Sequence, residues 1–252
     1  MKPADAAAHA PPVPAEPVRS FTNEPPTDFS RAEGTITIVV QEVGRTSALV
    51  TALQVGDVFL DFAGPLGLEV PLPTEGHAVL VAGGFGTGAV FPLARELRSR
   101  GVRVSSIIGA RTRDLVILAD LLATQSDELH VCTDDGSLGY RGFVTGRLEE
   151  LQDAGAGFTH CFAVGPMPMM RAVAKTTRRR GLAAMVSLDP LMVDGTGMCG
   201  GCRVTIGGKS LFACVDGPFF DAHQVDFDEA DARLMTYKEQ EDLACELAGL
   251  GR

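Results

Sequence analysis

The pattern of hydrophobic and polar positions divides the chain into three parts. Between residues 76 and 190, short apolar runs alternate with longer amphipathic stretches that carry their charges on one side. The apolar runs have the length of buried strands, and the amphipathic stretches have the length of helices. Strands that alternate with helices in this way predict a parallel sheet built from βαβ units. We therefore predict a Rossmann-like α/β domain over residues 76–190.

Each unit of this domain has its own sequence signal. Strands are predicted over residues 77–82, 102–110, 128–136, 160–166 and 182–190. Helices are predicted over residues 89–101, 114–124, 147–155 and 169–181.

The flanking segments have a different texture. Residues 1–33 are rich in alanine and proline and are expected to be disordered. Residues 35–43 and 57–67 read as strands, too few for a stable domain alone. Residues 191–225 are rich in glycine and cysteine with little hydrophobic pattern, so we expect a metal to staple them. An acidic helix is predicted over 227–250, within a C-terminal segment 226–252.

Composition and charge limit the classes of function that this chain can have. The chain has 252 residues and a formal net charge of −10, which argues against a nucleic-acid partner. No run reaches the ~18 apolar residues of a membrane span, and the N-terminus lacks the apolar core of a signal peptide. We therefore expect a cytoplasmic protein, whose six cysteines stay reduced.

A glycine turn follows the first strand of the α/β domain. It contains the residues Gly83, Gly84, Gly86, Thr87 and Gly88. In a parallel sheet, ligands bind where strands end and helices begin, and a helix N-terminus attracts phosphate. The spacing is not the G-x-G-x-x-G fingerprint, so an ordinary βα turn remains the alternative to nucleotide binding.

Three further strand ends carry polar or glycine-rich turns. They contribute the candidate nucleotide-binding residues Arg111, Asp134, Asp135, Gly136, Gly165, Pro166 and Met167. Any one of them is explicable as a plain turn, but together they favour a ligand at this edge of the sheet.

The cysteine-rich segment has the spacing of a metal site. Plant-type [2Fe–2S] ferredoxins use C-x4-C-x2-C…C, and this chain has D-x4-C-x2-C-x11-C from Asp194, Cys199, Cys202 and Cys214. We predict a [2Fe–2S] cluster with the Asp194 carboxylate as the fourth ligand. The alternative is zinc held by the three cysteines and His223, although that spacing matches no usual zinc motif.

The other cysteines have simpler interpretations. Cys132 and Cys161 lie in predicted buried strands and are expected to pack in the core. Cys245, on the predicted C-terminal helix, is interpreted as incidental to the chemistry.

Five stretches carry a resemblance to a known family. They are "GTITIVVQEVG", "IIGARTRDLVILAD", "TDDGSLGYRGFVT", "VSLDPLMVDGTGMCGGCRVTIGG" and "FACVDGPFFDAHQVDFDE". The chain resembles the electron-transfer subunits of the sulfide dehydrogenase and dihydroorotate dehydrogenase type, in the ferredoxin-reductase superfamily. Within that group it is most similar to the small (alpha) subunits of NADH-dependent ferredoxin:NADP oxidoreductase, whose near relatives carry Asp in the first ligand position.

The resemblance implies three modules and a partner. A β-barrel binds FAD, here partial and assigned to residues 34–75; residues 76–190 bind NAD(H) or NADP(H); residues 191–225 hold [2Fe–2S]. It further implies that hydride passes between nicotinamide and flavin, and that single electrons pass through the cluster. A larger flavoprotein or iron–sulfur subunit would receive or supply them. The cofactors carry this chemistry, so no catalytic side chain is expected.

Flavin-binding residues are implied by the same resemblance. They are Arg19, Phe21 and Thr22 in the R-x-[YF]-[ST] motif, then Gly44, Thr46 and Ser47, and finally Gly64, Pro65, Leu66 and Gly67. The family has three barrel strands before that motif, where this chain has 18 residues. A start site chosen too late, a loss of FAD and completion by a partner chain each explain the difference.

Three hypotheses remain open at this point. The first is an electron-transfer subunit that uses NAD(P)H, FAD and [2Fe–2S] within a larger oxidoreductase, either bifurcating or dihydroorotate-linked. The second is a flavin-less subunit that binds only the cluster and the nucleotide. The third is a zinc-stapled regulatory module, which an iron analysis would exclude.

Overall fold

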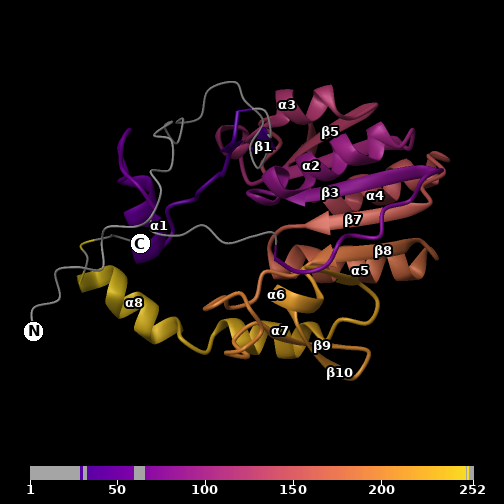
Figure 1. The fold of residues 1–252 in the computed structure, drawn as a ribbon. Coiled ribbons are helices and arrows are strands. Elements are labelled where there is room, and N and C mark those ends of the chain that lie inside the picture. Colours follow the sequence, from indigo (N-terminus) through magenta and orange to yellow (C-terminus); the bar gives the residue numbers. More distant parts are fainter. Residues whose placement is uncertain (1–28, 31–32, 60–65, 248, 250–252) are drawn as a thin grey trace, which may run out of the picture.

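A seven-stranded sheet forms the centre of the molecule (Figure 1). The computed structural model describes residues 29–30, 33–59, 66–247 and 249. The sheet has the strand order β11-β8-β7-β3-β4-β5-β6, and all neighbours are parallel except β11, which runs antiparallel to β8. The strands are β3 (His77–Gly83), β4 (Arg103–Ala110), β5 (Glu128–Thr133), β6 (Tyr140–Arg141), β7 (His160–Val164), β8 (Ala183–Ser187) and β11 (Phe219–Asp221).

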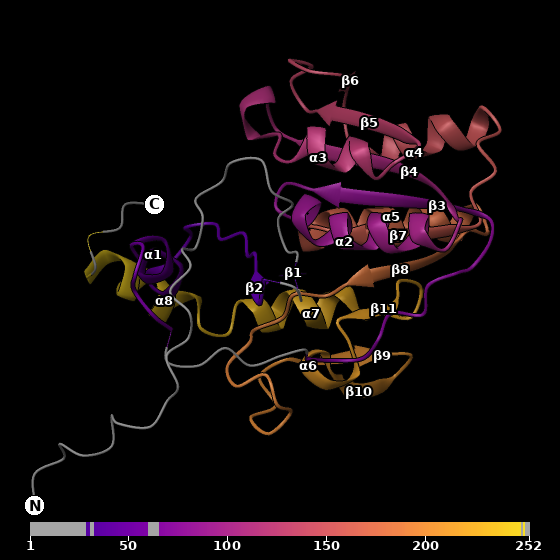
Figure 2. The ribbon, with the colours of Figure 1, turned by 45° about the horizontal axis from the view of Figure 1, so that its top comes forward.

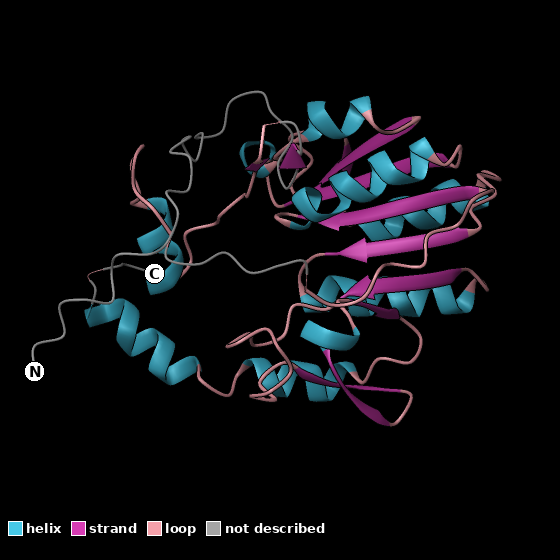
Figure 3. Cartoon of the chain, viewed as in Figure 1, coloured by secondary structure: helices cyan, strands magenta, loops and turns pink. Residues whose placement is uncertain are grey.

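Helices cover both faces of the sheet (Figure 3). They are α2 (Gly86–Ser99), α3 (Ala119–Thr124), α4 (Val144–Asp153) and α5 (Met167–Arg179). Every residue of β3 is buried, and its alternate side chains enter two different hydrophobic clusters. Val79 and Val81 face the cluster that includes α4 and α5, whereas Ala78 and Leu80 face the cluster of α2 and α3. The apolar run over residues 78–82 of β3 therefore reflects burial on both faces, as the parallel sheet requires.

The strand order places a reversal of direction beside β3. From β3 the chain adds β4 and then β5 on one side, and later adds β7 and β8 on the other side. The helices α2 and α5, which follow β3 and β7, therefore leave the carboxyl edge toward opposite faces of the sheet. Such a switch point is where open α/β sheets bind their ligands.

The predicted elements of residues 76–190 are confirmed, with one exception. The stretch predicted as a helix over 114–124 is a short 3₁₀ turn (η1, Arg113–Leu115) followed by α3. Leu118 separates them with a φ of 59°, in the left-handed region that a continuous α-helix excludes. The apolar periodicity was correct, but it did not reveal this break.

The C-terminal segment forms a small module against the sheet. Two antiparallel strands, β9 (Arg203–Ile206) and β10 (Lys209–Phe212), make a hairpin that the sequence reading missed. It is followed by α6 (Ala213–Asp216), α7 (Phe227–Leu234) and α8 (Lys238–Leu247), so the predicted single helix over 227–250 is two helices. Arg171 on α5 fastens α7 by donating to the carboxylates of Asp228 and Asp231, both at 2.5 Å.

The N-terminal described residues form little regular structure. They contain the short antiparallel pair β1 (Phe29–Ser30) and β2 (Thr35–Ile36), and the helix α1 (Arg45–Thr51), which lies beside α8 (Figures 1 and 2). The strand predicted over 35–43 is therefore wrong beyond Ile36, and residues 57–59 of the strand predicted over 57–67 are not extended into a sheet. A strand needs a hydrogen-bonded neighbour, and within the described ranges this segment has one only at β1.

Two predictions from the sequence concern this N-terminal region. The described part of residues 34–75 shows no barrel closure, so the partial barrel stays a prediction of the resemblance. The expected disorder of residues 1–33 falls almost entirely outside the described residues. Across the part of the chain that the structure describes, no helix is both long and apolar enough to cross a membrane.

Candidate functional site: a nucleotide crevice and a cysteine loop

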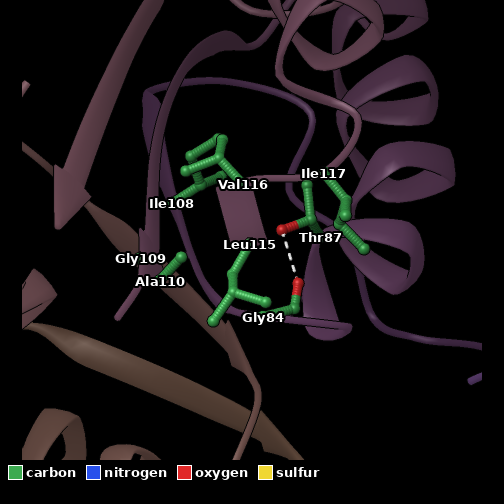
Figure 4. Close-up of a pocket in the computed structure, with 8 residues that line it drawn as sticks. All are labelled: Gly84, Thr87, Ile108, Gly109, Ala110, Leu115, Val116 and Ile117. Atoms are coloured by element: carbon green, nitrogen blue, oxygen red, sulfur yellow. Dashed lines mark hydrogen bonds between the residues drawn. The ribbon is translucent and has the colours of Figure 1, made fainter. Parts of the chain in front are cut away.

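The glycine turn after β3 is shaped by close contact with its neighbour. A β-carbon at Gly86 would lie 2.1 Å from the carbonyl oxygen of Val164, so no larger residue fits between α2 and the end of β7. Gly84 has a φ of +51° and accepts hydrogen bonds from the backbone N–H of Thr87 at 3.2 Å and its hydroxyl at 2.8 Å (Figure 4). The turn thus brings the first turn of α2 to the switch point, with its N-terminal end toward the carboxyl edge of the sheet.

The turn after β7 packs directly on the turn after β3. A β-carbon at Gly165 would lie 3.0 Å from the Gly83 nitrogen, and one at Gly83 would lie 3.0 Å from Pro166. Met167 begins α5 and is buried. The structure therefore brings together the candidate residues from these two strand ends, as the parallel order requires.

The turns after β4 and β5 are joined by backbone hydrogen bonds. The N–H of Asp134 donates to the carbonyl of Ala110 at 3.1 Å, and the N–H of Asp135 donates to the carbonyl of Arg111 at 3.3 Å. The N–H of Gly84, in the turn after β3, donates to the carbonyl of Gly109 in β4 at 2.8 Å. Hydrogen bonds from Ser137 hold the pKa of Asp135 below its usual range. That carboxylate is engaged in shaping its own turn, whereas Arg111 and Asp134 are exposed beside it.

A small hollow lies between these turns (Figure 4). Its polar side contains Gly84, Thr87 and Gly109, which the sequence singled out or placed at a strand end. Its apolar side comes from Ile108, Leu115, Val116 and Ile117, which sequence reasoning missed. The predicted helix over 114–124 hid Leu115, Val116 and Ile117, because these residues precede the break at Leu118 and do not belong to α3.

The predicted flavin residues fall into three groups. Arg19, Phe21, Thr22, Gly64 and Pro65 lie outside the described residues. Gly44, Thr46 and Ser47 form the start of α1, where the Ser47 hydroxyl accepts the N–H groups of Val43 and Gly44 at 2.9 Å.

The third flavin group lies against the cysteine module. Leu66 Cδ1 would be 2.8 Å from a β-carbon at Gly195, and a β-carbon at Gly67 would be 2.2 Å from the Gly217 carbonyl oxygen. Leu68 donates its N–H to that same carbonyl at 2.7 Å. The segment after the undescribed residues 60–65 is therefore fastened next to the cysteine loop.

The cysteine loop, residues 191–202, projects from the sheet (Figure 2). Its donor groups, with Cys214 on α6, lie in two places. Asp194 Oδ2 accepts the N–H of Cys199 at 2.8 Å, and Asp194 Oδ1 accepts the N–H of Thr196 at 2.7 Å. These hydrogen bonds hold the pKa of Asp194 below its usual range, and the bond from Thr196 has the largest effect. The second place holds Cys202 and Cys214, whose sulfurs lie 3.1 Å apart; the contact raises the pKa of Cys214.

The arrangement of donors bears on which metal centre this region can hold. A single zinc ion needs four donors around one centre. A [2Fe–2S] cluster instead needs two donors for each of two irons, and the sulfurs of Cys202 and Cys214, 3.1 Å apart, are placed to serve one of them. His223 points elsewhere, with Nε2 3.0 Å from the Thr177 hydroxyl, so the zinc alternative loses its fourth ligand.

The loop backbone also fits a cluster. Gly195, Gly197 and Gly200 all have positive φ values, and the N–H of Gly201 donates to Cys199 Sγ at 3.4 Å. Hydrogen bonds to sulfur are one of the means by which a protein sets a cluster's potential. Cys132 and Cys161, by contrast, are buried in the sheet as predicted, and burial raises their pKa values to about 11 and about 12.

Comparison with known proteins agrees with this site. The family model for the iron-sulfur cluster binding domain of dihydroorotate dehydrogenase B matches residues 189–226, which contain all four proposed ligands. A dihydroorotate dehydrogenase B electron transfer subunit homolog of Thermotoga maritima is 43% identical over 219 residues, covering 87% of this chain and 77% of the relative. The electron transfer subunit of Geobacillus thermodenitrificans is 37% identical, over 77% of this chain and 75% of its own length.

A solved structure extends the comparison to the whole fold. A chain from the structure of the NADH-dependent reduced ferredoxin-NADP oxidoreductase, studied for flavin-based electron bifurcation, matches with a TM-score of 0.82. It is 42% identical, and the match covers 87% of this chain and 79% of that one. The chain belongs to the family of dihydroorotate dehydrogenase B electron-transfer subunits and is an oxidoreductase subunit.

Proposed function

We propose that this chain passes electrons between NAD(P)H, FAD and a [2Fe–2S] cluster, to or from a larger flavoprotein or iron–sulfur subunit. The observation that carries the proposal is the pairing of donors in the cysteine loop. The sulfurs of Cys202 and Cys214 lie 3.1 Å apart and would serve one iron. The Asp194 carboxylate, which accepts the backbone N–H of Cys199, would serve the other iron together with the Cys199 thiolate. When bound, the flavin would accept hydride as an electron pair and the cluster would pass electrons one at a time.

The nucleotide crevice suits the pyrophosphate and nicotinamide of such a donor. The turn from Gly83 to Gly88 presents backbone N–H groups and the positive end of α2, where a phosphate binds. Leu115, which is exposed, and Val116 offer apolar surface on the adjoining side of this turn. Arg111, exposed at the end of β4, is placed to contact a phosphate or ribose.

The surroundings of the cysteine loop support electron exchange with a partner. Cys199 is exposed, and apolar side chains surround the loop: Met198 is 87% exposed and Val193 is 70% exposed. An exposed apolar rim of this kind is typical of a protein–protein contact. A partner that covers it would bring its own redox centre near the cluster and exclude water from the path.

A flavin-less subunit remains the second candidate, because one observation favours it. The described part of residues 34–75 contains only the short strand β2 and the helix α1, with no barrel around a flavin. In that case the residues of the crevice and the cysteine loop keep their roles, and hydride transfer takes place on another chain. We also propose a cytoplasmic location, because the proposed thiolate ligands stay reduced in that compartment.

The deciding experiment measures iron, acid-labile sulfide and flavin in the purified full chain, with and without the large subunit. Two irons and two sulfides per chain with stoichiometric FAD support the proposal. Two irons without FAD support the flavin-less candidate. Zinc in place of iron would refute both.

Substitution of Asp194 tests the ligand assignment directly. Asp194→Cys should retain two irons and shift the cluster's reduction potential, because thiolate and carboxylate oxygen differ as donors. Asp194→Ala should lose at least half of the iron. Asp216→Ala is the matched control, because that carboxylate accepts the N–H of Phe212 and is not a proposed ligand. An unchanged potential in Asp194→Cys would count against Asp194 as a ligand.

A further inference from the structure

An arginine from helix α7 reaches back to the cysteine loop. Arg233 is half-buried, and its Nη2 donates to the carbonyl oxygens of Gly200 at 3.4 Å and Gly201 at 3.1 Å. Its buried Nε has no hydrogen-bond partner among the described residues. The guanidinium is therefore held over the loop between Cys199 and Cys202, and its contacts there are to backbone carbonyls.

One of these carbonyls belongs to the peptide that contacts a proposed ligand. The carbonyl of Gly200 and the N–H of Gly201 are the two ends of a single peptide group. That N–H donates to Cys199 Sγ at 3.4 Å. The guanidinium, the peptide and the sulfur thus form one continuous chain of hydrogen bonds. Charge at one end of such a chain polarises every bond along it.

A purely mechanical role does not account for this contact. The N-terminal half of α7 already has its own anchor, because Arg171 binds Asp228, Asp231 and the carbonyl of Phe227. Glu229, one turn before Arg233, has a buried Oε2 with no hydrogen-bond partner among the described residues, so it does not neutralise the guanidinium by a direct contact. The positive charge of Arg233 is directed at the loop.

We propose that Arg233 is a positioning residue that tunes the cluster through the Gly200–Gly201 peptide. The inference rests on the proposed function, since it needs Cys199 to ligate the cluster. A polarised N–H stabilises negative charge on the sulfur, and one-electron reduction adds negative charge to the cluster. Arg233 therefore raises the reduction potential above the value that the ligands alone would set.

The test is a potentiometric titration of the reconstituted full chain, followed by electron paramagnetic resonance. Arg233→Gln removes the charge and can still contact one carbonyl. It should lower the potential so that the ratio of reduced to oxidised cluster falls about tenfold at a fixed potential, which is 59 mV for one electron. Arg233→Lys keeps the charge and should recover most of that loss.

The matched control is Arg203→Gln. Arg203 adjoins Cys202 in the sequence and carries the same charge, but its side chain is exposed. It should change the ratio by less than threefold. An effect as large as that of Arg233→Gln would show that any nearby charge acts through space, and would overturn the role of the peptide. A wild-type potential in Arg233→Gln would overturn the inference as well.

The iron content distinguishes a failure of the proposed function from a failure of the proposed role of Arg233. Wild-type chain without two irons would overturn both the proposed function and the role of Arg233. Fully loaded wild type and variants with equal potentials would overturn only the role of Arg233. If Arg233→Gln does not bind two irons, the cluster-loaded Arg233→Lys variant provides the test. A reduction potential equal to that of wild type supports the role of the Arg233 charge, whereas a tenfold lower ratio of reduced to oxidised cluster contradicts it.

Discussion

At the residue scale, the surroundings of five of the six cysteines divide them by chemistry. Cys132 and Cys161 lie inside the sheet, where desolvation disfavours the thiolate. Cys202 and Cys214 are buried together beneath the loop, and Cys199 is exposed at its tip. Only the thiolate reacts with electrophiles, so exposure and pKa together predict which thiols react.

We expect iodoacetamide at pH 8 to label Cys199 in the cluster-free chain and to spare Cys132 and Cys161. A thiol with a pKa of about 11 is ionised in roughly one molecule per thousand at that pH. Mass spectrometry of peptides after a short pulse measures the labelling, and unfolding in guanidinium provides the control in which all six cysteines react. Loading the cluster should protect Cys199. Equal labelling with and without the cluster would contradict its assignment as a ligand.

At the scale of elements, the start of α2 depends on how closely it approaches β7. Gly86 and Gly88 both lie in the first turn of α2, but their surroundings differ. A β-carbon at Gly86 would meet backbone at 2.1 Å, whereas at Gly88 it would only touch Leu118 Cδ1 at 3.7 Å. Substitution by alanine therefore tests close packing at Gly86 and helix propensity at Gly88.

Gly86→Ala should destabilise the chain by at least about 2 kcal/mol, because α2 must move away from β7. In a domain of this size that corresponds to a melting temperature lower by roughly 4–8 °C. It should also weaken NAD(P)H binding, since the crevice opens. Gly88→Ala is the matched control and should be neutral or stabilising by up to about 1 kcal/mol. Calorimetry and nucleotide titration measure both effects, and equal melting temperatures would refute this account of the turn.

At the scale of the whole molecule, the N-terminal segment leaves apolar side chains in water. Ile36, Val43, Leu49, Val55, Val58 and Leu68 are all exposed. Within the described residues, the short β1–β2 pair supplies no sheet to cover them. Apolar groups gathered on a surface favour association with a partner or with further copies.

The isolated chain should therefore self-associate and bind a hydrophobic dye, and pairing with the large subunit should reduce both. The double variant Val55→Asn, Val58→Asn should lower dye binding of the isolated chain by at least half. Met235→Gln, at an equally exposed position in the C-terminal module, is the control and should change it little. Sedimentation and dye fluorescence measure the two effects. A monomer without dye binding at tens of micromolar (roughly the range in which such surfaces associate) would contradict the prediction.

The sequence by itself determined the α/β domain and the set of proposed ligands. Local periodicity is strong where a strand is buried on both faces, as in residues 77–82, and the spacing of Cys199, Cys202 and Cys214 is a covalent property of the chain. The break at Leu118, the β9–β10 hairpin and the two-helix C-terminus had no such local signal.

The tertiary structure alone decided how these parts meet. It brought the sulfurs of Cys202 and Cys214 together, and it turned His223 toward Thr177. It also brought Arg233 of α7 onto a peptide more than thirty residues earlier in the chain. Such contacts join residues that are distant in sequence, and their geometry depends on how whole elements pack rather than on any local pattern.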